Sequence, residues 1–463
     1  MALSAATVME VRTDGSDENG GGFVSTGSGT DRSQQASPQV HIDNSAITTS
    51  ITTNTITFTA GYTATSADVD NLVQMLTGTN VTAGFYRITA ATSSTWTLDR
   101  NAVTSGTTVN ATAKMGGSLA SPGRAGGAMS GTGSVAGMQT WVRLGTYSIT
   151  STSSNVSGGR VTLSTANTRM IGYDTERGDA TGVRPTFLAA VNTMTLVTIS
   201  NDAVLANINL SAGAQTGILG VSSTSGALLY YVRMTGANTT AAFRGQANSH
   251  HILCEASGGT VTGFRGEGGH FYGCVAKGVA GRGFDMGSND STCVRCVSIN
   301  HTGSAGKGFD LSTATGSAMF INCTAYGNAD HGFDNSAAPA AACQWINCIA
   351  YGNSDGGFNS NGRAWNCAAG DNLTDYHANT IQIDSIVLTE DPFTSVADLD
   401  FSLNLADGGG ADCRSAGIPG AFPSLITTTG HLDLGAAQHL STSRVTSSRH
   451  ILLALPRAWS VEQ

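Results

Sequence analysis

The sequence predicts an all-β fold in which stacked parallel β coils form a solenoid. Three observations lead to this prediction. The composition favours short strands and tight turns, a repeat of 20 to 27 residues runs through the second half of the chain, and Phe and Cys recur at corresponding places in that repeat. A coil of this size cannot bury its own apolar face, so it must stack on its neighbours.

The composition argues against a helical protein. The chain has 463 residues, of which 59 are Gly, and only 12% are charged and 6% aromatic. Ser, Thr and Asn fill much of the remainder, and like Gly they form helices poorly. A hydrophobic fraction of 40% is nevertheless enough for a buried core and excludes wholesale disorder.

Charge and hydropathy exclude several classes of partner. The net charge is −9 and the pI is about 5.5, whereas nonspecific nucleic-acid binding needs basic patches. No apolar run approaches the length of a membrane span. The first residues, MALSAATVMEVRTDG, lack the basic and apolar regions of a signal peptide. We therefore expect no nucleic acid partner, no membrane insertion and assembly in the cytoplasm.

The nine Cys residues are expected to be buried free thiols. Their number is odd and their density is low for a secreted disulfide scaffold, whereas a reducing cytoplasm keeps thiols reduced. Cys293 and Cys296 form a CxxC, but no second CxxC completes a zinc site. We expect no metal and no other cofactor.

Two columns of residues define the repeat. In a parallel β coil stack, each inward residue lies about 4.8 Å from its equivalent in the next coil, so like side chains form ladders. Cys suits such a ladder because it is small, apolar and often fully buried. The predicted inward ladders are Phe243, Phe264, Phe284, Phe309, Phe333 and Phe358, and Cys254, Cys274, Cys296, Cys323, Cys348 and Cys367. Upstream, Ile218 is expected to continue the first, and Leu210 and Met234 the second.

Asn residues mark a corner of each coil. Asn300, Asn328, Asn353 and Asn372 follow the Cys column by four or five residues. Asn tolerates the left-handed backbone conformation that a tight corner requires. We expect these four residues to adopt it.

The periodicity divides the chain into four parts. Residues 1–39 form an N-terminal strand and cap region, residues 40–117 an inserted small β-barrel or sandwich module, residues 118–440 the parallel β-helix, and residues 441–463 a C-terminal cap or docking arm. In the third part, the segment SPGRAGGAM predicts a short capping helix with Ser121 as N-cap and Pro122 at its first position.

Several motifs resemble those of a known class. The coil INCTAYGNADHGFD, and the opening VRTDGSDENGGG followed later by WVRLGTYSI, resemble the right-handed parallel β-helix proteins of the pectin-lyase-like class. The inserted segment looks like a small β module of phage tail and fibre proteins, and GIPGAFPSLITTTGHLDLGAAQH looks like the end of many phage and environmental β-helix proteins. The resemblance implies the fold, and it favours a virion setting.

The candidate catalytic residues are Asp285, Asp310 and Asp334, which follow the Phe column. If Phe points inward they point outward at coil spacing, where two carboxylates can serve glycoside hydrolysis. The alternative interpretation, which we favour, is an outward scaffold column, because it changes from Arg to Asp to Asn and no Lys, Arg or His was found to recur beside it.

Two weaker sets of candidates remain. Tyr326 and Tyr351 are candidates for stacking on a sugar ring, or they simply cover a turn. Asp14, Asp17 and Asn19 are candidates for a cation, although a solvated turn is the preferred interpretation because no further acid completes a calcium-loop pattern.

The leading functional hypothesis is a virion structural protein: a tail spike, tail fibre or capsid-attached projection whose rigid shaft contacts host surface glycans. We expect a homotrimer on the virion surface, joined to other virion proteins through the N-terminal module or the C-terminal arm. The first alternative is a polysaccharide depolymerase, a hydrolase or lyase on the same fold, and the second is a cell-surface adhesin.

Overall fold

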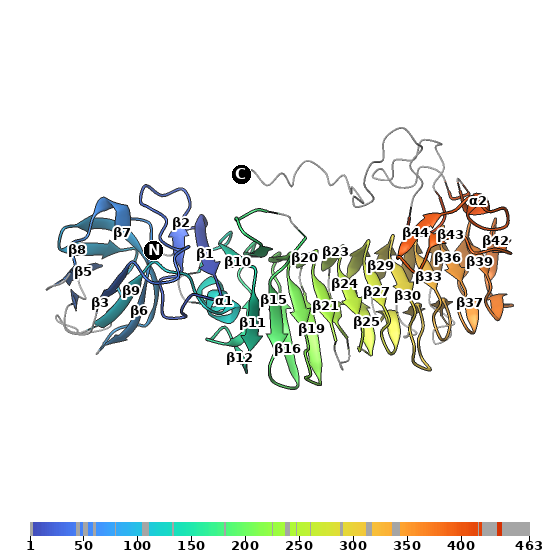
Figure 1. The fold of residues 1–463 in the computed structure, drawn as a ribbon, viewed down its shortest axis with the longest axis horizontal. Coiled ribbons are helices and arrows are strands. Elements are labelled where there is room, and N and C mark those ends of the chain that lie inside the picture. The colour runs from blue at the N-terminus through green and yellow to red at the C-terminus, as the bar shows by residue number, and fades with distance from the viewer. Residues whose placement is uncertain are drawn as a thin grey trace. The chain divides into compact units, whose positions relative to one another are not determined.

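The computed structural model describes residues 3–42, 47–49, 54–58, 62–78, 80–103, 111–131, 134–179, 182–224, 226–236, 241–246, 248–259, 261–287, 290–311, 317–335, 343–414, 416–418 and 433–437. The chain divides into two compact units, Met1–Val261 and Thr262–Gln463. Each unit contains a stack of parallel β coils (Figure 1), and each is described by itself. The predicted C-terminal arm, residues 441–463, lies outside the described residues.

The coils of the first unit form three sheets. Sheet A has the order β2 (Gly22–Val24), β1 (Thr7–Val11), β10 (Gln139–Arg143), β14 (Arg169–Tyr173), β17 (Val204–Ala206), β20 (Leu228–Tyr230) and β23 (His250–Ile252). Sheet B has the order β11 (Thr146–Ile149), β15 (Thr186–Ala189), β18 (Asn209–Ser211), β21 (Arg233–Thr235) and β24 (Glu255–Ser257). Sheet C has the order β12 (Ser151–Ser154), β13 (Gly159–Leu163), β16 (Met194–Ile199), β19 (Ile218–Ser223) and β22 (Phe243–Gln246).

An antiparallel module interrupts the start of this stack. Its seven-stranded sheet has the order β3 (Val40–Ile42), β9 (Ala111–Met115), β6 (Leu72–Gly78), β7 (Gly84–Thr92), β8 (Thr95–Leu98), β5 (Thr55–Phe58) and β4 (Ile47–Thr49), with a 3-10 turn η1 (Ser66–Asp68) before β6. It has an apolar core of its own that includes Tyr86 and Trp96. Because β1 pairs in parallel with β10, the strands before and after the module are neighbours in one sheet.

The predicted capping helix is confirmed as α1 (Pro122–Ser130). The Ser121 side chain accepts a hydrogen bond from the Arg124 backbone N–H, and Pro122 occupies the first turn. The buried helix face contains Ala125, Ala128 and Met129, and the helix packs on β13. It therefore covers apolar surface of the first coils, which have no preceding coil to cover them.

The coils of the second unit also form three sheets. Sheet D has the order β26 (His270–Tyr272), β29 (Ser291–Val294), β32 (Ala318–Ile321), β35 (Cys343–Ile346), β38 (Arg363–Trp365) and β41 (Ile381–Ile383). Sheet E has the order β27 (Val275–Lys277), β30 (Val297–Ile299), β33 (Thr324–Tyr326), β36 (Ile349–Tyr351), β39 (Ala368–Gly370) and β42 (Ile386–Leu388). Sheet F has the order β25 (Thr262–Glu267), β28 (Arg282–Met286), β31 (Phe309–Leu311), β34 (Phe333–Asp334), β37 (Gly356–Asn359) and β40 (Thr374–Tyr376).

Stacked Phe rings run through the interior of the second unit. Phe264, Phe284, Phe309, Phe333 and Phe358 are fully buried, and consecutive ring centroids are 4.7 to 4.9 Å apart. Tyr376 extends the stack at 5.3 Å from Phe358. Phe243, in the first unit, is also buried and packs edge-on against His251. The centroid spacing equals the distance between coils, so the strand register alone places the rings face to face.

The strand register corrects two upstream extensions of the predicted columns. Phe243 lies beside Val221, not Ile218, which pairs instead with Met194. Leu210 and Met234 align with Ala256, two residues beyond Cys254. The prediction from the sequence misplaced these residues, because the early coils lack the Cys and Phe residues that fix the register of the later coils.

From Cys274 onward, the Cys column lies at the corner between sheets D and E. All nine Cys side chains are free and buried. The thiols of Cys323, Cys348 and Cys367 each donate to a backbone carbonyl of the preceding coil, at 3.4, 3.4 and 3.3 Å. Burial raises the pKa of Cys323 and Cys367 well above the usual thiol range, which keeps these sulfurs protonated as donors.

The Asn column forms a hydrogen-bonded ladder inside the coils. Asn328 Nδ2 donates to Asn353 Oδ1 at 2.8 Å, and Asn353 Nδ2 donates to Asn372 Oδ1 at 2.9 Å. The left-handed backbone positions are the preceding residues, Gly327 and Gly352, with φ of 60° and 65°. The prediction of left-handed backbone was therefore correct only for Asn300, with φ of 53°.

A returning segment covers the outer face of sheet E. It comprises β43 (Phe393–Ser395), β44 (Asp400–Leu403), α2 (Gly410–Cys413) and residues 433–437. Phe393, Phe401 and Leu434 pack there with Ile349 and other outward-facing side chains of the sheet to form a second apolar core. Among the described residues, no helix is long and apolar enough to cross a membrane.

Replacing a ring within the Phe stack should strongly destabilise the second unit. We expect Phe309→Ala to lower the free energy of unfolding by about 3–5 kcal/mol, the usual range for truncating a buried Phe. Chemical denaturation followed by circular dichroism measures this loss. Leu373→Ala is the matched control because Leu373 is 77% exposed. Equal effects of the two substitutions would contradict a stabilising role for the stack.

The thiols should be inaccessible in the folded protein. We expect almost no reaction of native protein with a thiol reagent such as dithionitrobenzoate, because all nine Cys residues are buried. Denaturation should expose nine reactive thiols per chain, which absorbance of the released thiolate measures. Rapid native modification of Cys323, Cys348 or Cys367, located by peptide mass, would show that the corner between sheets D and E opens.

Candidate functional site

The three candidate Asp residues lie in one column on sheet F. The strand register pairs Asp285 with Asp310, Asp310 with Asp334, and Asp334 with Asn359. The neighbouring Phe side chains point inward, so by strand alternation these side chains point away from the coil interior. They are nevertheless only 6%, 1% and 1% exposed for Asp285, Asp310 and Asp334. The column therefore faces outward without being solvated.

Two basic side chains bury and neutralise the Asp column. The Arg282 guanidinium lies 3.3 Å from the Asp285 carboxylate and 2.5 Å from that of Asp310. Lys307 Nζ lies 3.4 Å from Asp310 and forms a second, closer ion pair with Asp334. Each cation thus bridges the carboxylates of two adjacent coils, which opposes the repulsion between like charges at this spacing.

The sequence contained a signal for these cations that was missed. Arg282, Lys307 and His331 each stand three residues before an Asp of the column, in the motifs RGFD, KGFD and HGFD. The expectation that no Lys, Arg or His recurs beside the Asp column was therefore wrong. Where the basic residue is absent, in GGFN, the Asp is replaced by Asn359, whose Nδ2 donates to Asp334 Oδ1 at 2.9 Å.

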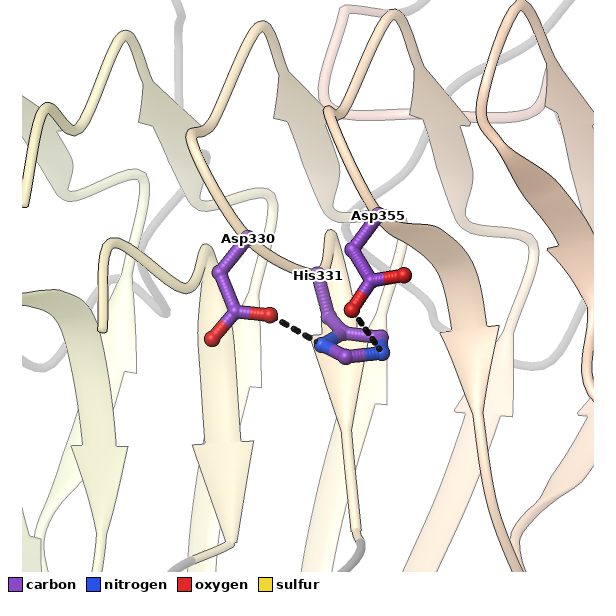
Figure 2. A group of neighbouring side chains, drawn as sticks. All are labelled: Asp330, His331 and Asp355. Carbon is purple, nitrogen blue, oxygen red and sulfur yellow. Dashed lines mark hydrogen bonds and ion pairs between the residues drawn. The ribbon is translucent and has the colours of Figure 1, made fainter. Parts of the chain in front are cut away.

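The third basic residue, His331, has different carboxylate partners. Its Nδ1 forms a close hydrogen bond with Asp330 Oδ1, and its Nε2 lies 3.4 Å from Asp355 Oδ2 (Figure 2). Ligand atoms of the three residues lie within 4.8 Å of one another. The two carboxylates, however, contact opposite nitrogens of one ring, an arrangement that suits a ring held between two side chains better than ligands converging on a metal ion.

Electrostatics distinguish Asp310 within the column. Burial raises the pKa of Asp310 to about 6, although the adjacent Lys307 and Arg282 act in the opposite direction. The carboxylates of Asp310 and Asp334 raise the pKa of Lys307, against the effect of its burial. A carboxyl with a pKa near 6 has the protonation behaviour of a general acid, but a catalytic acid must also contact substrate, and Asp310 is 1% exposed.

The candidate aromatic residues are covered as well. Tyr351 is 8% exposed and stacks on Tyr326, with 6.1 Å between ring centroids. Tyr326 packs against Phe393 and Phe401, and its hydroxyl donates to Asp391 at 3.2 Å. The returning segment therefore occupies the face that stacking on a sugar ring would need.

The three N-terminal candidates have separate structural partners in the first unit. Asp17 Oδ1 accepts from the backbone N–H of Ser121 at 2.8 Å, and its Oδ2 accepts from the Ser121 and Ser157 hydroxyls at 2.6 Å. Asn19 is buried and its Nδ2 donates to the carbonyl of Ser118 at 2.8 Å. Asp14 pairs with Arg12 at 3.0 Å.

These contacts explain the N-terminal motif without a cation. Asp17 binds the backbone at the start of α1, and Asn19 joins the N-terminal turn to the segment that follows β9. Asp14 also lines a hollow of about 270 Å³ with Arg12, Arg143 and Asp174. The two Arg side chains make this hollow unsuited to a metal ion.

Comparison with known proteins identifies the fold. No protein-family model matches the sequence. No match was found among curated proteins either. Among solved structures, the pectate lyase Pel9A aligns with a TM-score of 0.51 and 15% identity, over 69% of this chain and 91% of that one. The chain has a right-handed parallel β-helix fold, similar to that of this pectate lyase.

Two phage proteins are also among the structural matches. Geobacillus virus E2 ORF18 aligns with a TM-score of 0.38 and 12% identity, over 55% of each chain. The tailspike protein gp49 from Pseudomonas phage LKA1 aligns with a TM-score of 0.22 and 11% identity, over 76% of this chain and 61% of that one. A fold alone does not decide a function, so the choice between an enzyme and a structural protein depends on the site.

The raised pKa of Asp310 predicts a specific pH dependence of stability. An Asp has a pKa near 3.9 when unfolded, so the folded state binds this proton more tightly. The stabilisation that protonation gives is complete below about pH 4 and is lost as pH rises through about 6. The difference in unfolding free energy between the wild type and Asp310→Asn should therefore change across this interval.

Urea denaturation at half-unit pH steps measures this difference. Asp407→Asn is the control, because Asp407 is exposed. Parallel pH curves for the wild type and Asp310→Asn would show that the buried carboxyl does not titrate in this range.

Proposed function

We propose that this protein is a non-enzymatic virion structural protein, a tail spike, tail fibre or capsid-attached projection, in which the β-helix forms a rigid shaft. The observation that carries the proposal is the burial of every candidate catalytic carboxylate in the Asp column. Asp285, Asp310 and Asp334 are at most 6% exposed and share Arg282 and Lys307. Carboxylates as buried as these are not positioned to contact a polysaccharide chain.

The interior of the coils supports a mechanical role. Phe rings, Cys thiols and Asn amides each bond or pack from one coil to the next in the second unit. A solenoid of this kind gains its stability from interfaces between neighbouring coils. A stiff shaft that holds other surfaces at a distance requires this property and no active site.

The virion setting rests on the sequence. The inserted module and the segment GIPGAFPSLITTTGHLDLGAAQH resemble parts of phage tail and fibre proteins. The proposal includes a homotrimer on the virion surface, contact with host surface glycans, and attachment to other virion proteins through the N-terminal module or the C-terminal arm.

A depolymerase is the second candidate, and one observation favours it. The pKa of Asp310 is raised to about 6, and a second carboxyl lies one coil away, which is the pairing that glycoside hydrolysis uses. This function would require the Asp column to become accessible when a polysaccharide binds.

Incubation with bacterial surface polysaccharides separates the two functions. We expect the purified protein to release no oligosaccharide from a panel of capsular polysaccharides and lipopolysaccharides, as measured by reducing-end assay and mass spectrometry. Release that is abolished by Asp310→Asn, with circular dichroism unchanged, would establish the depolymerase and overturn the structural proposal. Release that persists in Asp310→Asn would indicate a contaminant or another site. A monomeric mass in sedimentation at micromolar concentration would contradict the trimer.

A further inference from the structure

Sheet D carries a row of apolar side chains on its outer face. The register aligns Tyr272, Val294, Ile321, Ile346, Trp365 and Ile383, one from each strand. Their neighbours Phe271, Cys293, Phe320, Trp345 and Ala364 are buried inside the coils, so by alternation the row faces outward. Five of its members are half-buried, and Ile321 is buried. An uninterrupted outward apolar row is unusual where solvated positions are expected to be polar.

The row is only one side chain wide, which restricts the kind of surface or segment that can cover it. The next outward column of the same sheet contains His270, Thr292, Gln344 and Arg363, together with Met319 and Ile381. A flat face of another subunit needs roughly 800 Å² per partner. A single extended segment fits a row that is one side chain wide.

The described chain ends beside this row. Asn322 and Asn347 directly follow row members Ile321 and Ile346. Asn322 Nδ2 donates to the Asp433 carbonyl at 2.8 Å, and Gly435 N–H donates to the Asn347 carbonyl at 2.7 Å. Residues 433–437 are therefore fixed at the corner of sheets D and E, and the chain continues from there.

The remaining residues have the length and composition to follow the row. Residues 451–456 read ILLALP, carry no charge and lie between Arg449 and Arg457. Fourteen positions separate residue 451 from residue 437, enough to span about 46 Å when extended. Six strands at about 4.8 Å spacing extend only about 24 Å.

One member of the row and one Asn next to it also have polar atoms that lack partners among the described residues. Trp365 Nε1 and Asn347 Nδ2 are both buried donors without an acceptor. Buried donors are normally hydrogen-bonded, because leaving one unsatisfied is costly. The backbone carbonyls of an extended segment along the row would supply acceptors.

We propose that the apolar row of sheet D is the docking surface for residues 451–459 of the same chain. The returning segment that covers sheet E then continues over the corner and covers sheet D. This inference is independent of the proposed virion function, since it concerns how one chain completes its own surface.

Cross-linking in the full-length protein tests this proposal. Leu453→Cys is combined with Met319→Cys, which lies on sheet D and is 38% exposed, and the pair is treated with a short bismaleimide. The control pair combines Leu453→Cys with Leu373→Cys, which is 77% exposed near the last coil. We expect the Met319 pair to form an intrachain adduct at least tenfold faster than the Leu373 pair. The wild-type protein measures any background from native thiols.

A second set of variants tests whether apolar contact drives the docking. Leu452→Asp together with Leu455→Asp should slow the Met319 adduct to the rate of the Leu373 pair. Equal rates for the two pairs, or an adduct rate that the Asp substitutions leave unchanged, would overturn the proposal. A faster Leu373 adduct would place the segment at the end of the stack instead. Adducts between two chains would assign the row to a second copy of the protein.

Discussion

The parallel register between coils is the constraint on which the rest of the second unit depends. It places each residue directly beside its counterpart about 4.8 Å away, so any residue type that recurs must interact with itself. Phe, Cys and Asn meet this condition in three ways. The rings stack, each thiol donates to a carbonyl of the preceding coil, and each amide both donates and accepts. His301 adjoins the Asn ladder, where burial lowers its pKa to about 3 and its neutral ring lies 2.8 Å from Ser298 Oγ.

A repeated Asp cannot meet the same condition alone, because like charges at this spacing repel each other. In the second unit, a basic residue stands three positions before an Asp of the column in successive coils. Arg282 and Lys307 therefore each lie between two carboxylates. The carboxylates of this ion column are buried, and its geometry serves cohesion between coils. The resemblance between a carboxylate ladder and a hydrolytic carboxyl pair therefore follows from the repeat itself and is weak support for catalysis.

The sequence allowed prediction of the features that repeat and did not allow prediction of those that depend on distant segments. The Phe and Cys columns could be found because identical residues recur with nearly constant spacing. Val221 was missed in favour of Ile218 because a coil with neither Phe nor Cys offers no marker of register. The basic residues of RGFD and KGFD are recognisable in the sequence, because each stands three positions before an Asp of the column. The covering of Tyr326 by Phe393 and Phe401 could not be inferred, because no local pattern indicates where a chain returns.

The returning segment also limits how this protein can change in evolution. A bare solenoid tolerates the gain or loss of a whole coil, since each coil contacts only its neighbours. Here residues 391–413 and 433–437 contact several coils at once, through Tyr326, Asn322 and Asn347. Deleting or duplicating one of these coils would separate contacts that a single covalent segment must make together. The returning segment therefore fixes the number of coils that it covers. Coils that no such segment covers can vary in number.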